Sequence, residues 1–423
     1  MHTARRVAVT ASAVTALLLS SVGAALATSP TDDPVEAAAG WLTTQLTDGR
    51  RITVQFGDDV FDSYGPTADV LFALAGAGVA SGYSTAIADW FDQPDQVAGY
   101  TGDGVDEIYA GATGKLLLVA ATAGRDPTDF GGRDLVAQLT GRRDVDGRFR
   151  DESAFGDFSS TLTQAVAVLG LYRTDTGGLE PEDVQFLLDQ QCADGGFRFD
   201  PDTGDCTSQV DTTGMVVQAL FAVGGPDADN AVSDAVEWLV EVQEESGGFA
   251  GSAEPANANS TGLAALALSL GGADDAAAAA RAWIVTLQHD CDDDEPGAIQ
   301  AMTDDPGDLV LATTQALWGM SAVSLADVTV AGASEAVPLL DCAPTDEEPI
   351  DDGPDDGADD GPDDEADEVL ETGPDVRPAA QVDTTAPVLP ETGGERTSIL
   401  LLGGVMLGLG ALLVAAGRRS TSA

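Results

Sequence analysis

Histidine and lysine, which serve acid, base and zinc chemistry in many proteins, are rare in this 423-residue chain. The sequence has two histidines, His2 and His289, and one lysine, Lys115. Because His2 lies in a segment that we expect to be removed, a zinc site or a Ser-His-Asp triad would depend on His289 alone. We assign no catalytic residue. The one candidate is Asp211, a carboxylate at the start of an apolar stretch.

The charge of the chain excludes nucleic acid as a partner. The sequence contains 72 acidic and 18 basic residues, for a net charge of −54. Binding to phosphates needs stripes of Lys and Arg, which this composition does not supply. We interpret the charge as a means of staying soluble at a crowded surface. The hydrophobic content of 43% is enough for one large core or two ordinary ones.

The N-terminal segment has the pattern of a secretory signal peptide. Arg5 and Arg6 precede an apolar run over residues 7–19, and small residues follow at Ala25 and Ala27. Basic, apolar and cleavage regions in this order are typical of such signals. The apolar run is too short to span a membrane, so we predict a signal peptide over residues 1–27.

The C-terminal segment, residues 389–423, resembles the LPxTG cell-wall sorting signal of Gram-positive surface proteins. Its pentapeptide is Leu389, Pro390, Glu391, Thr392 and Gly393. An apolar run over about residues 398–416 and the basic pair Arg418-Arg419 follow, as in a transmembrane helix with a cytoplasmic tail. The resemblance implies cleavage by sortase after Thr392 and covalent attachment of Thr392 to peptidoglycan. A plain C-terminal membrane anchor is the alternative.

Residues 344–388 are rich in Asp, Glu, Pro and Gly. Their apolar content is too low to offset the entropy of ordering, and their like charges repel. We predict a disordered, extended stalk that carries the preceding domain outward from the wall.

The remaining part, residues 28–343, is built from a repeated unit. One pattern occurs twice, at 191–225 and 243–272. It consists of a glutamine, three further residues, a Gly-Gly-Phe turn and a predicted helix of small apolar residues. Weaker copies bring the number to six, with reference positions at residues 41, 90, 135, 186, 238 and 283. Apolar residues at helical spacing predict two helices for each copy, or twelve in all.

One helix of each predicted pair is too apolar to face water. Residues 263–268, for example, read Leu-Ala-Ala-Leu-Ala-Leu. Six such helices inside six outer ones would close into an all-α domain, an α/α toroid of six helix pairs. An open stack of helix pairs is the structural alternative.

This unit resembles the prenyltransferase/squalene-cyclase repeat, found in terpene cyclases, protein prenyltransferase β-subunits, complement thioester domains and cobalamin carriers. The resemblance implies the toroid fold and says less about activity. Class II terpene cyclases carry an Asp-x-Asp-Asp acid motif at an inner-helix start. Here only Asp211 of that motif is present, with Gln209 and Thr212 in place of its partners, and Asp211 could simply cap a helix. A matching string at residues 290–293 falls in a predicted loop.

The other reactive groups of the family are also missing. The chain lacks a zinc ligand set and the Cys-Gly-Glu-Gln thioester string, and its 5% aromatic content is low for stabilising carbocations. These absences favour a protein that is not an enzyme. We expect no cofactor, although the acidic loops at 200–205 and 290–295 could hold calcium.

Four cysteines in a secreted chain predict two disulfides. Of the three connectivities, we prefer the one that joins nearby loops, Cys192–Cys206 and Cys291–Cys342.

A binding site is expected at the mouth of the toroid where the inner helices begin. Free N–H groups and positive helix ends would meet there. The predicted rim residues are Tyr64, Tyr109, Asp157, Asp211, Asn259 and Asp308. A polar and aromatic rim suits a small molecule, a glycan or a peptide. The simpler interpretation is that these residues only cap helices. We expect a sortase-anchored surface protein with a non-catalytic binding or adhesion module. The alternative is an extracellular lyase or terpene-cyclase-like enzyme with Asp211 as acid.

Overall fold

The computed structural model describes residues 28–174, 177–252 and 255–342, which form thirteen helices and four short strands. The predicted signal peptide (1–27), the acidic stalk (344–388) and the transmembrane segment (about 398–416) lie outside the described residues. Among the residues that are described, no helix is long and apolar enough to cross a membrane.

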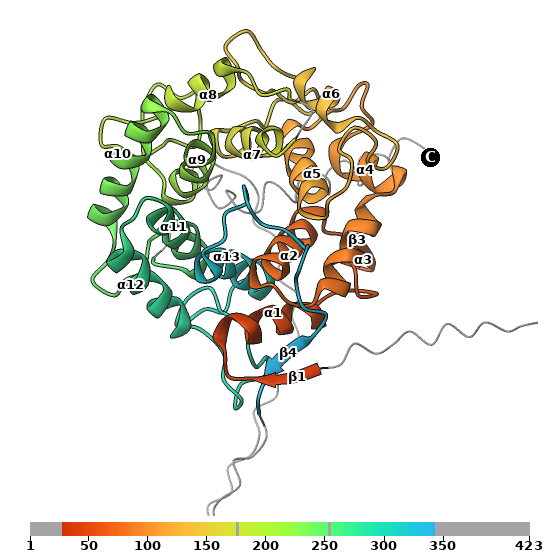
Figure 1. Cartoon of the computed structure of the whole chain (residues 1–423), viewed down its shortest axis with the longest axis vertical. Coiled ribbons are helices and arrows are strands. Elements are labelled where there is room, and N and C mark those ends of the chain that lie inside the picture. The colour runs from red at the N-terminus through yellow and green to blue at the C-terminus, as the bar shows by residue number, and fades with distance from the viewer. Residues whose placement is uncertain (1–27, 175–176, 253–254, 343–423) are drawn as a thin grey trace, which may run out of the picture. The chain divides into compact units, whose positions relative to one another are not determined.

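Six inner helices form a closed ring (Figure 1). Each inner helix contacts the next one, and the last contacts the first, so the ring closes and is not an open stack. These helices are α2 (Tyr64–Ala77), α5 (Ala110–Thr122), α7 (Thr161–Tyr172), α9 (Val210–Val223), α11 (Ala258–Leu270) and α13 (Leu309–Ser321). The predicted α/α toroid is therefore present.

Seven outer helices surround the ring, one more than the six predicted. They are α1 (Pro34–Thr44), α3 (Ser81–Phe91), α4 (Pro94–Thr101), α6 (Leu135–Thr140), α8 (Pro181–Leu188), α10 (Pro226–Val242) and α12 (Asp274–Val285). The extra helix arises in the second copy, where Pro94 opens α4 just after α3 ends. A proline cannot continue a helix but is well suited to its first position.

Four strands were not part of the all-α prediction. Strand β1 (Thr28–Thr31) pairs in parallel with β4 (Val337–Leu340), which joins the beginning and the end of the domain. Strands β2 (Thr53–Phe56) and β3 (Asp59–Asp62) form an antiparallel hairpin just before α2.

Hydrogen bonds explain the Gln-x3-Gly-Gly-Phe motif. In the fifth copy, the Gln243 side-chain amide donates to the carbonyls of Gly247 (2.9 Å) and Ala276 (3.0 Å), so it joins its own turn to the next outer helix. The backbone N–H of Phe249 donates to the hydroxyl of Thr261, 2.9 Å away on the inner helix. The same Phe-to-Thr bond recurs in the fourth copy, between Phe197 and Thr213. Glutamine and threonine thus fix the turn between outer and inner helices.

The inner helices pack closely through glycines and run parallel. A Cβ added at Gly262 would stand 2.1 Å from the Gln315 carbonyl oxygen on the neighbouring helix. Gly114 of α5 faces Ala167 of α7, and Leu117 of α5 faces Gly170 of α7. A step of three residues along α5 thus matches a step of three residues along α7, so the two helices run in the same direction. All six inner helices therefore begin at one end of the toroid, which we call the N-terminal end.

Candidate functional site

The centre of the ring holds a small cavity of about 40 Å³. Pockets that hold drug-sized ligands measure roughly 300–1,000 Å³, so this space fits a few atoms at most. Apolar side chains from all six inner helices and from one later segment make up most of its lining: Phe72, Leu118, Leu162, Val166, Met215, Leu263, Trp318 and Leu325. At this level of the ring, side chains of the described residues therefore leave only a small space.

A buried ion pair lines this cavity. The Lys115 ammonium of α5 lies 2.6 Å from a carboxylate oxygen of Asp69 on α2, and each side chain is only 6% exposed. Burial raises the pKa of the Asp69 carboxyl, and the Lys115 charge opposes this shift. Sequence reasoning missed Asp69, although a charged residue inside an apolar inner helix was a visible signal.

Residues 322–336 close the lumen at the end where the inner helices stop. This blue segment loops over the ring in Figure 1. The Leu325 N–H donates to Gln218 of α9 (3.2 Å), and its carbonyl accepts from Arg173 beside α7 (3.0 Å). Leu325 is 3% exposed and lines the central cavity. This segment therefore covers the lumen at this end.

Two of the predicted rim residues, Asp211 and Asn259, lie on the lumen face. Each is four residues before a side chain that lines the cavity, Met215 on α9 and Leu263 on α11. Residues four apart share one face of a helix, so both lie one turn closer to the N-terminal end. In the part of the chain that the structure describes, the buried Asn259 amide nitrogen has no hydrogen-bond partner.

Tyr64 lies elsewhere, in an aromatic cluster between the inner and outer helices. Its ring stacks on Trp90 and Tyr100, with centroids 5.4 Å away in both cases. Its hydroxyl donates to Gln96, 3.1 Å away. Burial raises the pKa of Tyr64 to about 12. These contacts are those of a packing residue.

The other three predicted rim residues belong to helix starts and loops. Asp308 caps α13 by accepting from the Leu311 N–H (3.1 Å), and Tyr109 occupies the N-cap position of α5. Asp157 accepts from Arg150 (3.0 Å) in the loop before α7. The six residues thus lie at or just before the starts of the inner helices, and their role as a binding rim stays a prediction.

Asp151, which sequence reasoning missed, connects two loops of the N-terminal end. Its carboxylate accepts from the N–H of Ala110 at the start of α5 (2.7 Å) and from the N–H of Phe158 (3.2 Å). Burial raises the pKa of Asp151 to about 6, although both N–H groups favour the charged form. A β-bridge between Ile108 and Glu152 holds the same loops together.

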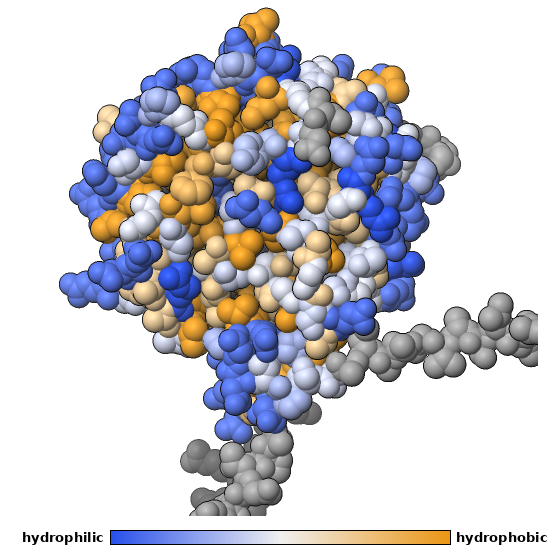
Figure 2. Space-filling model, in the orientation of Figure 1, coloured by the Kyte–Doolittle hydropathy of each residue, from blue (hydrophilic) through white to orange (hydrophobic). Residues whose placement is uncertain are grey.

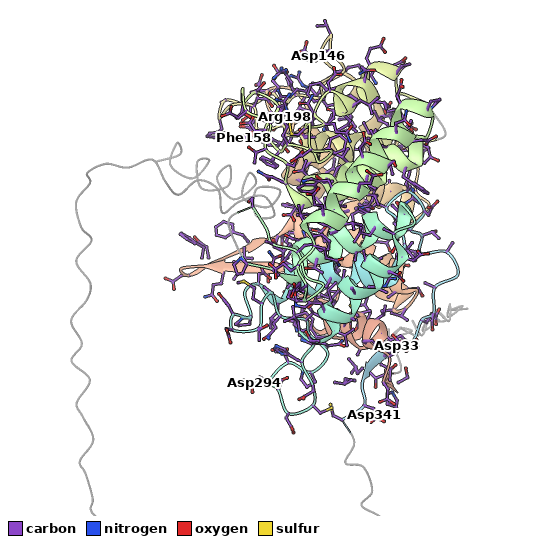
Figure 3. The ribbon with its side chains drawn as sticks, turned by 90° about the vertical axis from the view of Figure 1, so that its left-hand side faces the viewer. Asp33, Asp146, Phe158, Arg198, Asp294 and Asp341 are labelled. Carbon is purple, nitrogen blue, oxygen red and sulfur yellow. A yellow bond between two sulfur atoms is a disulfide. The ribbon has the colours of Figure 1, made fainter. Side chains whose placement is uncertain are left out.

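Five exposed apolar side chains, in addition to the exposed Val145, lie on loops of the N-terminal end. They lie in the hairpin before α2 and in the loops before α5 and α7: Phe56 (75% exposed), Val60 (65%), Val105 (74%), Phe155 (53%) and Phe158 (46%). In Figure 3 the β2–β3 hairpin projects from the side of the toroid on which Phe158 and Arg198 lie. We call these five residues the N-terminal crest.

Both predicted disulfides are confirmed. Cys192 is bonded to Cys206, with their Cα atoms 5.4 Å apart. Cys291 and Cys342 are also disulfide-bonded and no cysteine is free, so these two pair with each other. Within the described ranges, no group of three or more His, Cys, Asp or Glu side chains is placed to hold a metal ion. Calcium binding by the acidic loops stays a prediction.

Comparisons with known proteins support the anchor and the fold. Residues 381–421 match the family described as the LPXTG cell wall anchor motif, so the chain is secreted and anchored in the cell wall. The apo type II terpene cyclase MstE from Scytonema is 17% identical and has a TM-score of 0.51, over 68% of this chain and 96% of that chain. A protein from Actinoplanes is 16% identical, with a TM-score of 0.53 over 68% and 98%. No curated protein matches. Such a likeness shows a shared fold alone.

Proposed function

We propose that this cell-wall-anchored protein, with its terpene-cyclase-like fold, displays the toroid as a non-catalytic binding and adhesion module. The sorting signal implies processing by sortase and attachment to peptidoglycan. The anchored chain would then present its toroid to molecules at the cell surface. The small space between the described side chains at the centre of the ring supports a role without lumen chemistry, because about 40 Å³ cannot hold a polyprenyl chain or a sugar ring.

The observation that carries the proposal is the N-terminal crest. Three phenylalanines and two valines, each at least 46% exposed, lie on loops of three neighbouring copies. Exposed aromatic side chains that gather on one face of a secreted protein are typical of contact surfaces for other macromolecules. The loops that hold Val105 and Phe158 are tied together through Asp151 and the Ile108–Glu152 bridge, so the crest is partly preorganised.

The experiment is a binding screen against immobilised wall polymers, glycans and surface proteins. The chain from Thr28 to Thr392 would be compared with a variant in which Phe56, Phe155 and Phe158 are changed to serine. We expect at least one ligand that the native chain retains and the variant loses. A second variant combines Tyr109→Ala and Asp211→Ala, and it tests the predicted rim separately without removing the packing residue Tyr64. If neither variant changes any interaction, both forms of the binding proposal fail.

The enzyme alternative is kept for one reason: Asp211 lies on the lumen face of α9. An acid in that position could protonate a substrate if the lumen opened. Product formation from polyprenyl or uronic polysaccharide substrates, lost in Asp211→Asn, would favour this alternative over binding.

A further inference from the structure

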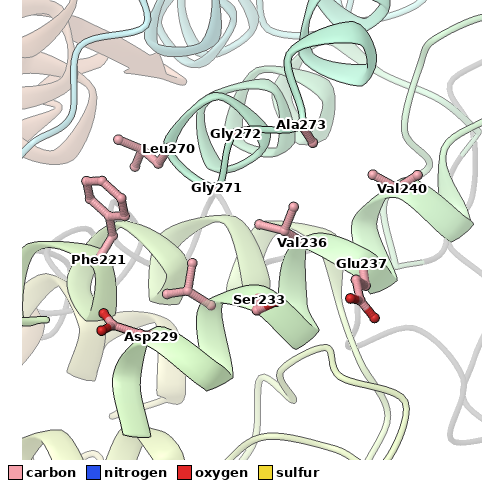
Figure 4. A pocket seen from close by; sticks show the side chains of 11 residues that line it. Phe221, Asp229, Ser233, Val236, Glu237, Val240, Leu270, Gly271, Gly272 and Ala273 are labelled. Carbon is pink, nitrogen blue, oxygen red and sulfur yellow. The ribbon is translucent and has the colours of Figure 1, made fainter. Parts of the chain in front are cut away.

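A groove on the outside of the toroid has an apolar floor and lies between α10 and the ends of α9 and α11. It measures about 580 Å³ (Figure 4). Val232, Val236 and Val240 follow one another every fourth residue of α10, so they form one stripe along the groove. Phe221 at the end of α9 and Val240 remain 49% and 47% exposed. Figure 2 shows apolar side chains reaching the surface over this α9–α10 side.

Acidic side chains border the same groove. Asp229 and Glu237 line it from α10, and neither takes part in any ion pair of the described residues. Helix α10 as a whole has five acidic residues and no basic one: Asp227, Asp229, Asp234, Glu237 and Glu241. The carboxylates beside the apolar stripe therefore have no ion-pair partner among the residues that the structure describes.

We propose that this groove binds a cationic amphipathic α-helix of a partner polypeptide. The apolar stripe of α10, with Phe221, would receive the apolar face of such a helix, as in other helix-in-groove complexes. Asp229 and Glu237 are eight residues apart, or about 12 Å along the helix axis. Two Lys or Arg side chains seven or eight residues apart on the partner would match this separation.

Charge selects this occupant over a second copy of the chain. Each copy carries a net charge of −54, so self-association through an acid-lined groove would bring like charges together. A wholly apolar partner would leave Asp229 and Glu237 partly desolvated and unpaired. A helix that is apolar on one face and basic at its edges satisfies both features of the groove.

The proposal can be tested with a synthetic helical peptide that has leucines on one face and lysines on the other. Its binding to the chain from Thr28 to Thr392 would be measured by calorimetry at physiological salt. We expect Phe221→Ala and the double variant Asp229→Lys/Glu237→Lys each to weaken binding by about tenfold or more. These side chains are exposed, so the fold should tolerate the changes, which circular dichroism would check.

Matched controls separate groove binding from general attraction to an acidic protein. Glu241→Lys and Val242→Ser change exposed residues of the same helix that do not line the groove, and we expect near-native binding for both. A scrambled peptide of identical composition should bind at least tenfold more weakly. The proposal is overturned if Glu241→Lys weakens binding as much as the groove variants do. It is also overturned if the scrambled peptide binds equally well, or if the groove instead mediates self-association in sedimentation experiments.

Discussion

The ion pair of Asp69 and Lys115 is the most buried charge pair at the centre of the molecule. Its contribution to the free energy of unfolding can be measured. Removing one partner leaves the other charge uncompensated in a site with 6% exposure. We expect Asp69→Ala to lower the free energy of unfolding by about 3–5 kcal/mol. The double variant Asp69→Leu/Lys115→Met should be close to native, because apolar residues of similar size can replace a buried pair. Denaturant unfolding would measure both.

If both variants lost the same small amount of unfolding free energy, this account would be contradicted, since water would then solvate the pair. A loss of about 3–5 kcal/mol of unfolding free energy in both variants would also contradict it. In that case the pair would be needed for folding in a way that apolar packing cannot replace.

Asp151 predicts a specific dependence of stability on pH. Its pKa is raised to about 6 in the folded protein, from 3.8 for the model carboxyl. The folded protein therefore keeps this proton over a range in which the unfolded chain has released it. Raising the pH from about 4 to 6 should lower stability through this group, by up to about 3 kcal/mol, with no further change above that range. Asp151→Asn should remove this contribution.

The measurement is the difference between native and Asp151→Asn unfolding free energies at pH 4 and pH 7. This difference isolates Asp151 from the many other carboxylates. The same difference at both pH values would show that burial does not raise this pKa.

At the level of residues, sequence reasoning found features that are local in the chain. Cys192–Cys206 closes a short loop, and Cys291–Cys342 followed because four cysteines allow only three connectivities. Asp211 was singled out because it opens an inner helix. The roles of Asp69 and Asp151 depend on partners 46 and 41 residues away, Lys115 and Ala110. With 72 acidic residues in the chain, such pairs cannot be identified before the ring brings them together, whereas four cysteines leave few choices.

Among the elements, the inner helices depend on close contact at glycine. A Cβ at Gly262 would lie 2.1 Å from the backbone oxygen of Gln315, so α11 and α13 would have to separate. We expect Gly262→Ala to destabilise the domain by about 1–3 kcal/mol, as overpacking usually does. Gly204→Ala is the control, because nothing lies within 4 Å of an added Cβ there. Thermal unfolding of both variants would test this prediction. Similar melting temperatures for the two variants would contradict tight packing of the inner helices.

The inner helices were predictable as elements, and the short outer ones and the strands were less so. Residues 263–268, predicted as part of an inner helix, lie within α11 (Ala258–Leu270), because burial on all sides leaves a continuous apolar pattern. Strands β1 and β4 pair residues more than 300 positions apart, such as Thr28 with Val337, and no local pattern marks such a pairing. In the second copy, two outer helices, α3 and α4, replace the single predicted one. The second of them starts at Pro94, because a proline interrupts a helix but can begin one.

On the scale of the whole molecule, contacts between the sixth and first copies should make the toroid unfold as one unit. Gln288 donates to the carbonyl of Pro34 at the start of α1 (2.8 Å), and the Trp41 indole donates to Glu295 (2.7 Å). We expect amides of α1 and α12 to exchange as slowly as those of the middle copies. In Gln288→Ala, protection should fall by roughly 1 kcal/mol or more in these two helices first.

Gln45→Ala is the matched control, since the Gln45 amide bonds only the adjacent Thr44 side chain. Fast exchange of α1 and α12 in the native chain would instead indicate the fraying ends of an open stack.

The central claim is that the anchored toroid works by binding through its N-terminal crest. The most direct measurement compares adhesion of the native chain with a variant in which Phe56, Val60, Phe155 and Phe158 are all serine. Val242→Ser/Val285→Ser, which removes exposed apolar side chains from outer helices, is the control. We predict that the crest variant loses the interactions found in the screen while the control keeps them. Unchanged binding by the crest variant, or substrate turnover that depends on Asp211, would contradict the claim.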